Sequence, residues 1–191
     1  MMMKREMFLP IKLPSHKSFQ GKNLTGTERF IYNLAADIYA NIQQWNSFHI
    51  KGVTYLRNII QVKHDKNYSV ILQDMCDKLE NVCNNLICLQ DGIITNLEQI
   101  KNQFIAITVL QETTTKLFLT WPMSKFGEIA ETIYQMYHKE ATLKRNLLEN
   151  IAHNHTETWK MFYLAAWVHQ PLLSENLTLL LNSLFIETGH Q

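Results

Sequence analysis

The chain has 191 residues, 46% of them hydrophobic, and a formal net charge of +1 from 18 basic and 17 acidic side chains. Six Gly and four Pro are too few for a turn-rich β or mixed fold, so the composition favours an all-α protein. The near-zero charge gives no general attraction to nucleic acid, and we expect no direct contact with DNA or RNA. Because no apolar run reaches membrane-spanning or signal-peptide length, we also expect no membrane contact.

The first helix is predicted over residues 25–62, after a flexible N-terminal segment at 1–24 that mixes Lys, Pro, Ser and Met without a sustained period. The run Thr25-Gly26-Thr27-Glu28 has the spacing of a capping box, which would satisfy the first free backbone N–H groups. Apolar side chains then recur at helical spacing, interrupted by Asn41 and Gly52: Ile31, Leu34, Ile38, Trp45, Phe48, Tyr55, Ile59 and Val62.

The second helix is predicted over about 66–110, after a polar run in which Asp65 can act as the cap. It carries a seam of apolar side chains at heptad spacing, broken at Asn96 and Gln103. The seam that we predict to bind a partner consists of Leu72, Met75, Leu79, Val82, Leu86, Leu89, Ile93 and Ile100. Residues 25–110 are therefore predicted to form a long antiparallel helical hairpin, similar to a coiled coil, whose longer second helix keeps apolar surface for a partner.

Residues 111–123 form the predicted linker, because a run of three Thr ends the periodicity and Pro122 cannot continue a helix. The C-terminal helical region is predicted over 124–190, with two or three shorter packed helices. The first begins with Ser124 as cap, the next ends before Pro171, and the last covers about 174–187.

The sequence contains few residue patterns that are typical of catalysis or of metal or cofactor binding, and we predict no catalytic, cofactor-binding or metal site. The glycine positions fit no phosphate-binding loop, and His153 and His155 lack the further ligands that zinc requires. Glu140 and Lys144 form an i,i+4 pair that we interpret as a solvated helix face. The pair Lys144-Arg145 is either solvated as well or available to an acidic partner.

Short runs of residues within 117–190, which include the motifs Thr-Trp-Pro, His-Gln-Pro and Glu-Thr-Gly-His, resemble the cyclin-dependent kinase 2-interacting protein family. The residues that carry the resemblance, and that we expect to serve the core or a partner, are Trp121, Pro122, Phe126, Tyr137, Lys144, Arg145, Trp167, His169, Gln170, Pro171, Glu187, Gly189 and His190. Trp121 and Trp167 are expected as packing anchors, with the core favoured over a partner interface.

The resemblance implies a non-catalytic adaptor, without cofactors, that pairs with another small helical subunit in an AAA ATPase-associated complex for ribosome maturation and replication or genome maintenance. It also implies links to cyclin-dependent or replication-initiating kinases and a nuclear location, with the cytoplasm as a second one. Two other functions stay open on the residues alone. One is a self-contained homodimeric coiled-coil scaffold without an ATPase connection, and the other is an RNA-contacting assembly factor.

Overall fold

The computed structural model describes residues 26–62, 71–110, 118–151 and 156–190, which contain helices and no strand. The helices are α1 (Thr27–Val62), α2 (Ile71–Leu110), α3 (Met123–Ile151), α4 (Glu157–His169) and α5 (Leu177–Thr188). The prediction of an all-helical fold is confirmed for these residues. Several predictions lie outside them: the flexible segment 1–24, the caps at Thr25 and Asp65, the linker residues 111–117, and His153 and His155.

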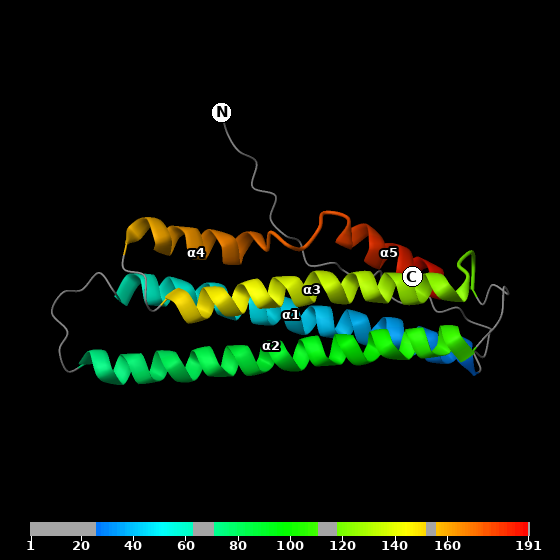
Figure 1. Cartoon of the computed structure of the whole chain (residues 1–191), viewed down its shortest axis with the longest axis horizontal. Coiled ribbons are helices and arrows are strands. Elements are labelled where there is room, and N and C mark those ends of the chain that lie inside the picture. Colours follow the sequence, from blue (N-terminus) through cyan, green and yellow to red (C-terminus); the bar gives the residue numbers. More distant parts are fainter. Residues whose placement is uncertain (1–25, 63–70, 111–117, 152–155, 191) are drawn as a thin grey trace, which may run out of the picture.

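The helices form a four-sided bundle in which consecutive sides run in opposite directions (Figure 1). α1 packs on α2, α2 on α3, and both α3 and α1 pack on α4 and α5. The fourth side therefore consists of α4 and α5 placed end to end, diagonally across the bundle from α2. The predicted hairpin of the first two helices is not a unit of its own, because α2 packs against α3 as well as α1 and one core cluster takes in side chains from every helix.

The buried side of α1 follows from its sequence pattern, since the predicted apolar positions from Ile31 to Tyr55 are buried wherever the structure describes their side chains. Two positions that interrupt the pattern are buried too. Asn41 donates a hydrogen bond to the Asp37 carbonyl at 2.8 Å. Gly52 lies under the indole of Trp167, and a Cβ on it would be 1.9 Å from Trp167 Cζ2. Gly52 thus allows a close approach of α4 to α1.

The buried side of α2 differs from the predicted seam. It contains Leu86, Gln90, Ile93, Leu97, Ile100 and Phe104. Leu86, Ile93 and Ile100 belong to both sets, whereas Val82 and Leu89 are 43% and 37% exposed. The buried side differs because α2 packs against both α1 and α3, so part of it faces α3. There Gln90 donates to the Ala141 carbonyl at 2.8 Å, and the Phe104 ring stacks on Phe126. The side chains of Leu72, Met75 and Leu79 lie outside the described residues.

The ends of the C-terminal helices follow local backbone chemistry. α3 begins at Met123, directly after Pro122, so Ser124 lies within its first turn and is not the cap that we predicted. Thr156 caps α4, and Gln170 ends it with a left-handed φ of 46° before Pro171, as predicted. α5 begins at Leu177, three residues later than predicted, because residues 174–176 form a turn. None of the helices within the described ranges combines the length and hydropathy needed to cross a membrane.

Substituting Gly52 by Ala tests the close approach of α4 to α1. We expect Gly52→Ala to lower the free energy of unfolding by about 1–3 kcal/mol, because the added methyl group overlaps a ring that has no free space to move into. Gly92→Ala is the matched control, since a Cβ at Gly92 meets nothing within 4 Å. The control should raise stability by about 0.5–1 kcal/mol through helix propensity. Urea denaturation measures the free energy of unfolding of both variants. Equal effects of the two substitutions would contradict the close packing of Trp167 on Gly52.

Candidate partner-binding surface

A buried cation fixes α4 to the rest of the bundle. Lys144 on α3 is 0% exposed, and its Nζ donates to the Trp167 carbonyl at 2.9 Å and to Nδ1 of His49 at 3.2 Å. The same Nζ lies 3.6 Å from Glu140 Oε1 and 4.1 Å from the centre of the Trp167 ring. Two hydrogen bonds and one ion pair therefore surround the ammonium group, and their acceptors come from α1, α3 and α4. We call Lys144, Glu140, His49, Trp167 and Gln170 the buried polar cluster.

The protonation states in this cluster follow from its burial. Burial lowers the pKa of Lys144 to about 8, against the attraction of Glu140, so the ammonium form prevails at neutral pH. Burial and the nearby ammonium lower the pKa of His49 to about 4, which leaves a neutral ring able to accept at Nδ1. Burial raises the pKa of Glu140, while the Leu172 N–H and Lys144 oppose the rise. The Leu172 N–H donates to Glu140 Oε2 at 3.0 Å and joins α3 to the turn after α4.

The interpretation of Glu140 and Lys144 as a solvated helix face is therefore wrong, since both side chains are 0% exposed. An i,i+4 pair has the same sequence spacing on any side of a helix, and this one faces the space between α1 and α4. Lys144 is neither solvated nor available to an acidic partner. Arg145 points to the other side and pairs with Asp91 on α2, where both side chains are partly exposed.

Trp167 and Gln170 complete the attachment of α4. Trp167 is fully buried, and its indole N–H donates to the His49 carbonyl at 3.0 Å. Gln170 is buried at the end of α4, where its Oε1 accepts from the indole N–H of Trp45 at 2.8 Å. Tyr137 packs edge-on against the same Trp45 ring. The structure thus places Trp167 in the core, while the neighbouring His169 and Pro171 are exposed.

A second polar contact attaches the end of α5 to the segment before α3. The buried Glu187 carboxylate accepts from the backbone N–H groups of Thr120 at 2.5 Å and Trp121 at 2.7 Å, and from the Thr120 hydroxyl at 2.8 Å. Burial alone raises the pKa of Glu187, but these donors outweigh it and hold the pKa below its usual value. Trp121 is half-buried with its ring against the fully buried Phe126, and Pro122 is exposed.

The C-terminal residues after α5 lie against the start of α1. Gly189 ends α5 with φ 79°, a left-handed conformation that glycine adopts without strain. The His190 ring then stacks on Tyr32 with 3.7 Å between ring centres, and its Nδ1 lies 2.8 Å from the Thr188 hydroxyl oxygen. The Thr-Trp-Pro and Glu-Thr-Gly-His motifs therefore meet at one end of the bundle. Many of the residues that carry the family resemblance thus stabilise the fold.

The outer side of α4 carries large apolar side chains that the other described residues leave uncovered. Trp159, Met161 and Phe162 are each about half exposed (49%, 59% and 54%), and Val168 and Leu172 are partly exposed. We call these five residues the α4 face. No charged side chain lies between Trp159 and Leu172 except Lys160, which is buried. Sequence reasoning assigned these aromatic residues to a helix without predicting their exposure, because a helix that is apolar on all sides looks like a core helix.

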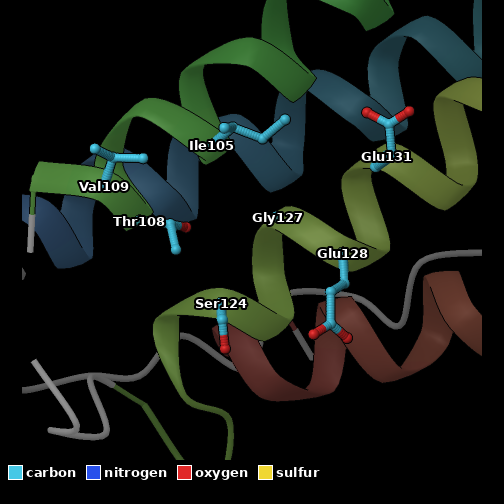
Figure 2. A pocket seen from close by; sticks show the side chains of 7 residues that line it. All are labelled: Ile105, Thr108, Val109, Ser124, Gly127, Glu128 and Glu131. Atoms are coloured by element: carbon cyan, nitrogen blue, oxygen red, sulfur yellow. The ribbon is translucent and has the colours of Figure 1, made fainter. Parts of the chain in front are cut away.

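Two further surfaces expose apolar atoms. Val82 and Leu89, the two seam residues that are exposed among those whose side chains are described, form the α2 stripe, on the side of the bundle diagonal to α4. A groove of about 260 Å³ lies where the end of α2 meets the start of α3, and Figure 2 shows the residues that line it. Its lining consists of Ile105, Thr108, Val109, Ser124, Gly127, Glu128 and Glu131. Within the described ranges, no three His, Cys, Asp or Glu side chains lie close enough together to hold a metal ion.

Removing the buried ammonium tests the polar cluster. Lys144→Met should lower the free energy of unfolding by about 3–5 kcal/mol, because it leaves the Glu140 carboxylate buried without a counter-charge. Adding Glu140→Gln should restore at least about 1 kcal/mol of that loss, since the double variant buries no charge. Urea denaturation of the single and double variants completes the cycle. If Glu140→Gln lowered the free energy of unfolding further, the unpaired Glu140 carboxylate would not be the cause of the instability of Lys144→Met.

Glu187 predicts a pH dependence of stability. Its pKa is lower in the folded chain than the usual 4.5, so its contribution is complete above that pH and is lost as the pH falls through the folded value. Glu187→Gln should lower the free energy of unfolding at pH 7 by about 1–3 kcal/mol, through the loss of charge-assisted hydrogen bonds. The difference from the parent chain should shrink in acid. A difference that stayed constant from pH 7 to pH 3 would refute the assignment.

Comparisons with known proteins extend the resemblance beyond residues 117–190. No protein-family model matches the chain. A human protein named cyclin-dependent kinase 2-interacting protein is 28% identical over 195 residues, which cover 88% of this chain and 92% of the human protein. Proteins of the same name from Xenopus laevis and Bos taurus are 27% and 30% identical, with 94% and 83% of this chain and 98% and 76% of those proteins covered. These relatives confirm the resemblance, and the chain belongs to the cyclin-dependent kinase 2-interacting protein family.

Proposed function

We propose that the chain is a non-catalytic helical adaptor that binds a protein partner through the α4 face. One observation carries this proposal: Trp159, Met161 and Phe162 are about half exposed on a helix that the buried polar cluster holds in place. Aromatic and Met side chains are enriched at protein interfaces, and a few such residues supply most of the binding energy. Because α4 is already fixed, little ordering entropy is lost when a partner binds.

We infer that this partner is a cyclin-dependent kinase, or a complex that contains one. Support for the inference comes from the relatives in human and Xenopus laevis, whose names state an interaction with cyclin-dependent kinase 2. The absence of exposed charge from Trp159 to Leu172 predicts that the partner contributes an uncharged apolar surface, since burying an unpaired charge would oppose binding.

The α2 stripe is the proposed site for a second helical protein. The family resemblance suggests a small helical subunit within an AAA ATPase-associated complex that serves ribosome maturation and replication or genome maintenance, and a nuclear location. Val82 and Leu89 lie seven residues apart on α2, the spacing at which a partner helix can contact both. Because α2 and α4 are diagonal in the bundle, both partners have room to bind at the same time.

Copurification separates this adaptor from the two alternatives. A stoichiometric helical subunit that stays with the chain through purification supports the adaptor. A stable homodimer that ignores other proteins would support the homodimeric scaffold. Binding to RNA that weakens steeply with salt would support the RNA-contacting factor.

The α4 face is tested with Trp159→Ser combined with Phe162→Ser. Binding to purified cyclin-dependent kinase 2, measured by calorimetry, should weaken by at least about tenfold, because hot-spot aromatic residues typically contribute more than 1 kcal/mol each. Ile50→Ser is the matched control, since Ile50 is an apolar residue of α1 that is 65% exposed, and it should leave binding unchanged. Thermal unfolding verifies that the variants fold.

Unchanged kinase affinity in the double variant would place the kinase interface elsewhere. Val82→Asp combined with Leu89→Asp then tests the α2 stripe separately, because these exposed positions tolerate charge, whereas Leu86 is buried and Asp there would unfold the chain. Loss of a copurifying helical subunit in this variant, with kinase binding retained, is the expected result for two independent sites.

A further inference from the structure

The groove in Figure 2 is an apolar surface, with acidic side chains beside it, that the described residues leave uncovered. Ile105 and Val109 on α2 line the groove together with the turn of α3 that carries Gly127, and Val109 is 74% exposed. Glu128 and Glu131 line the same turn, with their side chains 61% and 40% exposed in their ion pairs with lysines. An occupant of this groove should therefore offer apolar side chains together with positive charge.

The first residues of the chain have this composition. Residues 1–25 contain five Lys or Arg and one Glu, a net charge of +4, which leaves −3 for the rest of a chain whose total is +1. The apolar side chains are concentrated in residues 1–14: Met1, Met2, Met3, Met7, Phe8, Leu9, Ile11 and Leu13. Lys4, Arg5 and Lys12 lie among them, and together with Glu6 they give residues 1–14 a net charge of +2. This segment is opposite in charge to the helical body and rich in groups that prefer a covered surface.

The segment can also reach the groove. α1 begins at the end of the bundle where α2 finishes and α3 starts (Figure 1). The groove residues of α3 lie within its first nine positions, which places them about 13 Å or less from that end at 1.5 Å per residue. Residues 15–26 join the segment to α1, and an extended chain of that length spans about 40 Å. No rearrangement of the helices is required.

We propose that residues 1–14 bind in cis in the groove between the end of α2 and the start of α3. Phe8 and Leu9 cover Ile105 and Val109, and the basic side chains lie beside the two glutamates. The existing pairs do not block this arrangement. Glu128 with Lys125 and Glu131 with Lys101 are partly exposed ion pairs, which contribute little to stability, and a carboxylate accepts several donors. This proposal is independent of the α4 face and its partner.

Photocrosslinking in the full-length chain tests the proposal. The photoreactive p-benzoylphenylalanine replaces Phe8, the protein is irradiated, and mass spectrometry maps the linked peptides. We expect intrachain crosslinks to peptides that contain 105–109 or 124–131. A mixture of isotopically labelled and unlabelled chains distinguishes links within one chain from links between two. Crosslinks that join two chains, or that fall mainly on other helices, would overturn the proposal.

Charge reversal supplies the second readout. Glu128→Lys with Glu131→Lys should lower the groove crosslink yield by at least about fivefold, since both changes repel the basic segment. Adding Lys4→Glu, Arg5→Glu and Lys12→Glu should restore it. The matched control is Glu149→Lys with Glu175→Lys, two exposed glutamates outside the groove, which should leave the yield unchanged. Equal yields in all charge variants would overturn the proposal, and circular dichroism verifies that each variant folds.

Discussion

The buried ammonium group of Lys144 is the constraint on which the position of α4 depends. A charge inside a protein needs acceptors around it, and here they are the His49 ring, the Glu140 carboxylate and the Trp167 carbonyl. These groups belong to three different helices. Moving α4 away would remove one acceptor and expose the indole that lies over Gly52, so the electrostatic and packing requirements fix the same geometry.

Buried polar contacts between helices are concentrated on the fourth side of the bundle, because this side is divided into two short helices. α4 has 13 residues and α5 has 12, whereas each of the other helices has 29 or more. Short helices gain little from their own hydrogen bonds and depend on tertiary contacts. The buried polar cluster holds α4, and Glu187 and His190 hold α5. The residues that carried the family resemblance include Lys144, Trp167, Gln170, Glu187 and His190 of these contacts, whereas the exposed Trp159, Met161 and Phe162 were not among them.

Much of the architecture could be predicted from the sequence, because helical periodicity and proline act locally. The apolar period of α1, the end of α4 before Pro171 and the start of α3 after Pro122 needed no tertiary information. The inner face of α2 could not be predicted in full, since the buried Gln90 donates to the Ala141 carbonyl on another helix, and the sequence of α2 does not show that contact. Glu140 and Lys144 illustrate the same limit, because an ion pair has the same sequence spacing on a solvated face and in a core. The α4 face could not be predicted because exposure depends on which neighbours a helix has.

The buried polar cluster makes α4 a fixed part of the bundle, so the proposed partner-binding face is already formed in the free chain. Native-state hydrogen exchange of the free, full-length chain measures this most directly. We expect amides in the middle of α4 to exchange as slowly as those in the buried turns of α1, because both are released in the same unfolding event. Rapid exchange throughout α4, while α1, α2 and α3 stay protected, would contradict it.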